Sequence, residues 1–185
     1  MKIVLGGSRF LDKIPQNLFE LIREWVDLES EFLVGDAPGA DSAFQKTLKN
    51  AGSKSVTIYS SAGYIRNNFG DWPSKEIDSG LQSKSNAVHA FKDRYMTSIA
   101  DTGLMLWDCE SAGTLSNVID LVEYGKSCRI WVSSDAELYN FDNLPSLEKW
   151  LEQYPDVTKE ARKRLNTFRR RSAKRIKNEQ PALFE

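Results

Sequence analysis

The sequence predicts an α/β fold, namely a Rossmann-like, doubly wound parallel sheet of about five strands with a C-terminal helical extension. Short apolar runs of strand length alternate along the chain with segments of helical periodicity. Three of the runs end in turns that contain glycine. Because parallel strands are joined through right-handed crossovers, the helices should cover both faces of the sheet.

The apolar runs and the helical patterns follow one another in a regular order. The helix after the second run ends at Gly52, which suits a C-terminal cap. Strands are expected over residues 2–5, 32–34, 55–59, 103–107 and 128–132. Beyond the two helices that follow the first two strands, helices are expected over 88–100, 114–124, 144–154 and 158–177.

A segment rich in Gly, Pro, Ser and Asn, residues 60–87, lies between the third strand and the next helix. Loops of this length are uncommon in compact domains and are usually functional. Within the segment, Arg66 suits a phosphate contact and Trp72 suits a contact with a base. Both residues therefore belong to the predicted site.

Charge divides the chain into two parts. Residues 1–156 hold 15 basic and 23 acidic side chains, whereas 157–185 hold 10 basic and 3 acidic ones. We therefore expect a Rossmannoid domain over 1–135 and a basic helical extension over 136–185.

Composition excludes several classes of protein. No apolar run approaches the roughly 20 residues of a membrane span, and the N-terminus lacks the order of a secretory signal, so we expect a cytoplasmic protein without membrane contact. The single histidine and the absence of a cysteine cluster disfavour a metal site. No cofactor is expected.

Glycines follow the first, second and fourth predicted strands, at Gly6 and Gly7, at Gly35 and Gly39, and at Gly113. Glycine lets backbone N–H groups approach an anion closely, and ligands of open α/β sheets bind at the carboxyl ends of the strands. None of these turns matches the phosphate loop that ends in Gly-Lys-Ser/Thr or the full Gly-x-Gly-x-x-Gly fingerprint. The pattern indicates an anion or nucleotide pocket but disfavours ATP hydrolysis and ordinary NAD binding.

The turn after the fourth strand carries three polar candidates. Asp108 is placed to contact a ribose or a base, although its carboxylate could instead cap the following turn. Ser111 and Thr114 could bind phosphate, cap the next helix, or do both.

The first two turns carry three charged candidates. Arg9 could bind a phosphate or a carboxylate through its donor fork, or form a salt bridge at the mouth of the sheet. Asp36 and Asp41 are the two acidic candidates. Asp36 is the stronger ligand candidate because it stands at the end of its strand. Asp41 could instead occupy the first turn of the second helix for capping alone.

His89 and Asp93 are four residues apart and share a helical face, with Lys92 beside them. A lone histidine is more often structural, and the aspartate could serve only to orient it. Lys92 and Asp93 are nevertheless candidates for ligand contact.

Taken together, these motifs resemble those of the SLOG superfamily, which includes Smf/DprA-like and LOG-like Rossmannoid domains, and the chain looks like one of its small stand-alone bacterial and phage members. The resemblance spans about residues 1–132 and implies a sheet that binds a nucleotide or nucleotide-derived ligand across the glycine turns. It rests on the order of the motifs at 6–9, 35–41, 66–72, 92–96, 100–101 and 107–114.

LOG-like enzymes of this superfamily cleave the N-glycosidic bond of nucleoside 5′-monophosphates with an arginine and a glutamate. The matching positions of this chain hold Lys92 and Asn117. Asparagine cannot act as a carboxylate base, so the resemblance does not support that mechanism in its usual form. Asp93 or Asp108 could supply the acid instead.

Three functional hypotheses follow. The first is binding or sensing of a nucleotide-derived small molecule, and the second is hydrolysis of a nucleotide N-glycosidic bond with Asp93 or Asp108 as the catalytic acid. The third is nucleic-acid binding through the basic helix at 158–177, which could instead dock on the body of the protein or on a second subunit of a homo-oligomer. The predicted ligand-binding residues are Gly6, Gly7, Ser8, Arg9, Gly35, Asp36, Gly39, Asp41, Arg66, Trp72, Lys92, Asp93, Asp108, Ser111, Gly113 and Thr114.

Overall fold

The structure is a computed structural model that describes residues 1–61, 63–79 and 86–153. Its strands are β1 (Lys2–Gly7), β2 (Glu31–Gly35), β3 (Val56–Ser60), β4 (Ser74–Glu76), β5 (Thr102–Trp107), β6 (Ser127–Val132) and β7 (Glu137–Phe141). Its helices are η1 (Gln16–Leu18, a 3-10 helix), α1 (Phe19–Asp27), α2 (Ala40–Asn50), α3 (Asn86–Ile99), α4 (Ala112–Glu123) and α5 (Leu144–Gln153).

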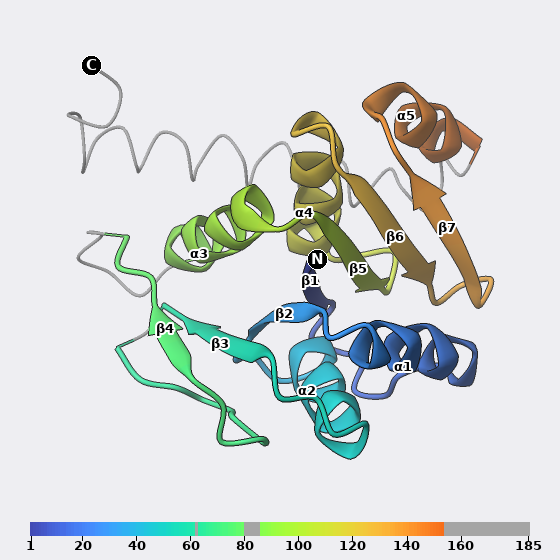
Figure 1. The fold of residues 1–185 in the computed structure, drawn as a ribbon. Coiled ribbons are helices and arrows are strands. Elements are labelled where there is room, and N and C mark those ends of the chain that lie inside the picture. Colours follow the sequence, from blue (N-terminus) through green and yellow to red (C-terminus); the bar gives the residue numbers. More distant parts are fainter. Residues whose placement is uncertain (62, 80–85, 154–185) are drawn as a thin grey trace.

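The predicted α/β class is confirmed. All seven strands form one sheet in the order β4-β3-β2-β1-β5-β6-β7 (Figure 1). Every neighbouring pair is parallel except β6 and β7, which are antiparallel. The five predicted strands correspond to β1, β2, β3, β5 and β6.

The two additional strands lie at the two edges of the sheet. β4 falls within the segment 60–87 that was predicted to be a loop, and β7 falls within the range assigned to the helical extension. All three residues of β4 are exposed, and only the last residue of β7 is buried. Neither strand therefore has the apolar pattern that marks the central strands.

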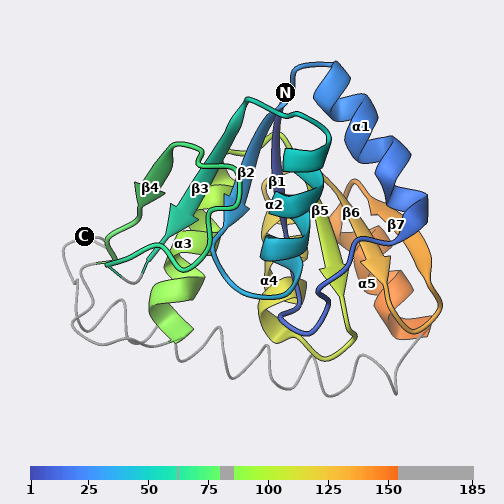
Figure 2. The ribbon, with the colours of Figure 1, turned by 90° about the horizontal axis from the view of Figure 1, so that it is seen from below.

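Helices cover both faces of the sheet, as Figures 1 and 2 show. On one face, α1 and α2 bury Ile22, Trp25 and Phe44 against the alternate side chains of the strands. On the other face, α3, α4 and α5 pack against a second core. The central strands are apolar on both faces because helices cover both of their faces.

The helix boundaries follow from local chemistry. α2 ends at Asn50, and Gly52 two residues later has a φ of 74°, as expected for a glycine after a helix C-terminus. Ser111 is the N-cap of α4, and its side chain accepts a hydrogen bond from the Thr114 N–H. The predicted helix over 158–177 lies outside the described residues. Among the helices that are described, none combines the length and the apolar composition needed to cross a bilayer.

The strand order places a switch point between β1 and β5. The chain proceeds from β1 outward through β2, β3 and β4, and then returns to pair β5 with the other side of β1. Ligand sites of open α/β sheets lie at such a point, outside the carboxyl ends of the strands.

Gly7 allows β1 to approach β5 closely at this point. A Cβ on Gly7 would overlap the carbonyl oxygen of Leu106 and lie 2.8 Å from the Leu106 nitrogen. Gly7→Ala should therefore lower the free energy of unfolding by about 2 kcal/mol, measured by urea denaturation. Gly113→Ala is the matched control, because a Cβ there meets nothing within 4 Å and alanine favours the helix. Equal stability of the two variants would contradict this assignment.

Candidate functional site

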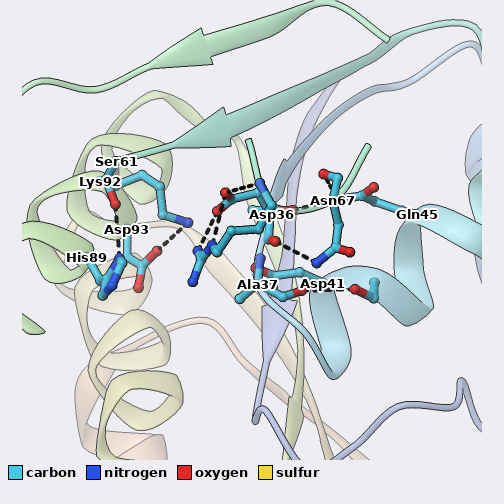
Figure 3. A network of polar contacts seen from close by, with 12 residues as sticks. Asp36, Ala37, Asp41, Gln45, Ser61, Asn67, His89, Lys92 and Asp93 are labelled. Atoms are coloured by element: carbon cyan, nitrogen blue, oxygen red, sulfur yellow. Dashed lines mark hydrogen bonds and ion pairs between the residues drawn. The ribbon is translucent and has the colours of Figure 1, made fainter. Parts of the chain in front are cut away.

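The carboxyl ends of β1, β2 and β3 meet a group of buried and half-buried charges, which we call the edge cluster: Asp36, Asp41, Arg66, Lys92 and Asp93. Asp36 directly follows β2, Asp41 is in the first turn of α2, and Lys92 and Asp93 are on α3. Since α2 and α3 cover opposite faces of the sheet, the cluster joins side chains from both faces over the sheet edge (Figure 3).

Asp36 and Arg66 form the most complete ion pair of the edge cluster. The carboxylate of Asp36 is fully buried and accepts hydrogen bonds from the Arg66 backbone N–H at 3.1 Å and from Nε at 3.0 Å, with a further bond from Nη2. Burial alone would raise the pKa of Asp36, but the hydrogen bonds and the charge of Arg66 outweigh it and lower that pKa. Asp36 and Arg66, which are both predicted to contact the ligand, thus bind each other.

The segment after Arg66 is attached to the end of β2 and to α2 by the side-chain amides of Asn67 and Gln45. Asn67 Nδ2 donates to the Asp36 carbonyl oxygen at 2.9 Å. Gln45 Nε2 donates to the Gly35 carbonyl oxygen at 2.8 Å, and Gln45 Oε1 accepts from the Phe69 N–H at 3.0 Å. Gln45, which no sequence pattern marks as a site residue, therefore holds this part of the long segment against the carboxyl end of β2.

Gly35 makes the meeting of Asp41 and Lys92 sterically feasible. A Cβ on Gly35 would overlap Asp41 Oδ2 and would lie 2.7 Å from Lys92 Nζ. The space that any other side chain would occupy is filled by a carboxylate from one face and an ammonium group from the other. Gly35, a predicted ligand-binding residue, thus leaves room for these two charged side chains.

Lys92 is the central cation of the edge cluster. Its Nζ lies 3.0 Å from Asp93 Oδ1, and the residue is only 3% exposed. Burial lowers the pKa of Lys92, but the carboxylates of Asp93, Asp41 and Asp36 together outweigh it and hold that pKa above its usual value. Lys92 is therefore charged at neutral pH and offsets several buried carboxylates at once.

Asp41 is a buried carboxyl group whose pKa is raised. Burial raises its pKa to about 6, with Lys92 opposing the rise and Asp93 adding to it. The carboxylate accepts a hydrogen bond from the Ala37 N–H at 3.1 Å, in the turn that precedes α2. Asp41 thus occupies the first turn of α2, as considered from the sequence, but α2 has no side-chain cap at its N-terminus.

His89 lies beside the edge cluster on α3. Its Nδ1 is hydrogen-bonded to Ser61 Oγ at 3.0 Å (Figure 3). Burial and then the nearby cations Arg66 and Arg9 lower the pKa of His89, so the ring is neutral near pH 7. The two arginines come from the loops after β1 and β3, and both loops therefore approach the same side of the sheet edge.

The polar residues after β1 and β5 form a separate network of hydroxyl groups. Ser8 Oγ accepts a hydrogen bond from the Asp108 N–H at 3.1 Å and lies 3.4 Å from Thr114 Oγ1, which donates to Ser111 Oγ at 2.9 Å. Asp108 Oδ1 accepts from the N–H groups of Glu110 and Ser111. Asp108 therefore caps the turn, which was the alternative role considered for it, and Ser111 caps α4 by accepting from the Thr114 N–H.

The first turn of α4 faces open space at the same edge. Its Ala112 and Gly113 N–H groups precede the first intrahelical hydrogen bonds and so have no acceptor within the helix. A Cβ on Gly113 would meet nothing within 4 Å. This helix end provides N–H donors and a partial positive charge for an anion.

Trp72 and Arg9 belong neither to the edge cluster nor to the network of hydroxyl groups. Trp72 Nε1 donates to the Ser53 carbonyl oxygen at 3.1 Å. Ser53 lies beyond the C-terminal end of α2, so the indole is near the amino ends of the strands and not near their carboxyl ends. Arg9 follows β1 and so lies at the carboxyl ends of the strands, where the site is predicted. It is exposed, and it forms no salt bridge with any described residue. Its guanidinium is available to a ligand.

The fold and this edge define a Rossmann-like α/β protein with a charge cluster at the carboxyl ends of β2 and β3, beside the switch point between β1 and β5. Comparisons with family models, with curated proteins and with solved structures find no match to the chain. Within the part of the chain that is described, no three His, Cys, Asp or Glu side chains are grouped so that they could hold a metal ion.

The raised pKa of Asp41 predicts a pH-dependent stability. Because the carboxyl binds its proton more tightly in the folded chain, its contribution is greatest below pH 4 and is lost as the pH rises through about 6. The difference between 3.8 and about 6 corresponds to about 3 kcal/mol. Asp41→Asn should therefore become more stable relative to the parent by up to that amount between pH 4 and pH 7.5 in urea titrations. A difference between the two proteins that does not change with pH would contradict this.

Proposed function

We propose that the protein binds a nucleotide or a nucleotide-derived small molecule at the carboxyl edge of β1, β2 and β5, as a member of the SLOG superfamily. The observation that carries the proposal is the exposed guanidinium of Arg9, which has no salt bridge among the described residues. Arg9 follows β1, one of the two strands of the switch point, and its charge lowers the pKa of His89 beside the edge cluster. In a protein whose other charges at this edge are paired internally, an arginine in this position favours an anionic ligand.

The remaining groups at the edge suit the polar parts of a nucleotide. The first turn of α4 offers backbone N–H donors for a phosphate. Asp93 retains 27% exposure of its side chain while one of its oxygens pairs with Lys92, and the neutral ring of His89 lies beside it. A partly exposed carboxylate and a neutral imidazole are suitable partners for the hydroxyl groups of a sugar.

Hydrolysis of an N-glycosidic bond is the second candidate, and the partial exposure of Asp93 is the observation that favours it. Asp93 could stabilise a developing positive charge on the sugar, whereas Asp108 has an oxygen occupied by two backbone N–H groups. Asn117 stands where the resembled hydrolases have glutamate, so binding without cleavage is the primary proposal.

Arg9→Gln should weaken the binding of adenosine 5′-monophosphate about tenfold or more, because it removes a charge-assisted hydrogen-bond donor from the phosphate. Isothermal titration calorimetry at constant salt measures the change. Arg23→Gln, which removes an exposed arginine on α1, is the matched control and should bind like the parent. Equal losses in both variants would show a general charge effect and argue against a specific site.

Incubation of the protein with the four ribonucleoside 5′-monophosphates should release no free base when followed by chromatography. Asn117 lacks the carboxylate that the related hydrolases use, and this is the reason for the expectation. Release of base that is lost in Asp93→Asn and kept in Asp108→Asn would establish the hydrolase instead.

A further inference from the structure

The turn after β1 presents two adjacent side chains at the carboxyl edge. Residues 8–11 form a tight turn in which the Leu11 N–H donates to the Ser8 carbonyl oxygen at 3.2 Å, with Arg9 and Phe10 at its centre. The same oxygen also accepts from the Ala40 N–H at the start of α2, again at 3.2 Å. The turn is therefore bonded both to itself and to the helix beside it.

Gly39 brings the backbone of α2 directly against this turn. Its φ is 81°, and a Cβ there would overlap the carbonyl group and the Cα of Arg9. No side chain separates the two segments, so the backbone at Arg9 is supported by close packing as well as by hydrogen bonds. This is a predicted ligand-binding glycine whose role is to fix the residue that would contact the ligand.

The two central side chains of this rigid turn both face solvent. Phe10 is 89% exposed, the highest value among the large apolar residues described as exposed. Its neighbour Leu11, in contrast, packs against the core between the sheet and the helices α1 and α2. The turn thus uses one apolar residue for anchoring, and it leaves the aromatic ring of the residue that follows Arg9 in water.

We propose that Arg9 and Phe10 form a clamp for a ligand that carries both a phosphate and a heteroaromatic base. Phe10 stacks on the base while Arg9 pairs with the phosphate, and the fixed turn holds both groups ready before binding. The inference rests on the proposed function and narrows its ligand class. Nucleoside monophosphates and their derivatives fit the clamp, whereas sugar phosphates without a base engage only Arg9.

The test compares two probes on variants of the full chain by isothermal titration calorimetry. Phe10→Ala should weaken the binding of adenosine 5′-monophosphate about tenfold and leave ribose 5-phosphate unchanged, because only the first probe has a base to stack. Phe10→Trp should restore the affinity for adenosine 5′-monophosphate. Leu28→Ala, which removes another exposed apolar side chain just after α1, is the control and should change neither affinity.

Each other result has a defined meaning. Parent-like affinity of Phe10→Ala for adenosine 5′-monophosphate, together with a loss in Arg9→Gln, overturns the clamp but keeps the proposed function. Equal losses for both probes in Phe10→Ala also overturn the clamp, because the ring would then act only through the shape of the turn.

A change in oligomeric state of Phe10→Ala on size-exclusion chromatography, without a change in affinity, assigns Phe10 to a protein contact and also overturns the clamp. Failure of the parent to bind any of the four ribonucleoside 5′-monophosphates or ribose 5-phosphate rejects the proposed function itself.

Discussion

The absence of a side chain at Gly35 is the constraint on which the rest of the site depends. A parallel sheet normally separates the helices on its two faces, yet Asp41 of α2 and Lys92 of α3 both occupy the space where a Cβ of Gly35 would stand. Lys92 in turn offsets the charges of three acidic residues. Removing that cation, or filling the space, would leave buried carboxylates without compensation, which is among the most destabilising changes a protein interior can undergo.

Around this constraint the polar residues divide into two groups. The hydroxyl groups of Ser8, Ser111 and Thr114 and the carboxylate of Asp108 satisfy one another and the nearby backbone, and so join the ends of β1 and β5. Arg66 and Asp36 likewise pair with each other and attach the loop after β3. The groups that still face solvent at the edge, above all Arg9, are those that our proposal assigns to the ligand.

The sequence predicted the central strands and the edge on which polar residues gather, because apolar periodicity and glycine turns are local signals. It did not predict β4 or β7, whose mostly exposed or half-buried residues carry no such signal. The pairing of Asp36 with Arg66 and the buried role of Gln45 depend on contacts between distant segments, which local patterns do not encode. Trp72 was predicted to contact a base because it is an aromatic residue within the long segment 60–87. A hydrogen bond to Ser53 instead holds its indole near the amino ends of the strands.

Mapping of amide chemical shifts tests the central claim most directly. A nitrogen–proton correlation spectrum of the full chain, recorded during titration with adenosine 5′-monophosphate, reports every backbone position that senses the ligand. The account predicts that the largest shifts fall on residues 6–10, 35–41 and 111–114, which meet at the carboxyl edge of the sheet. Shifts confined to β7 and α5, with none at this edge, would contradict it.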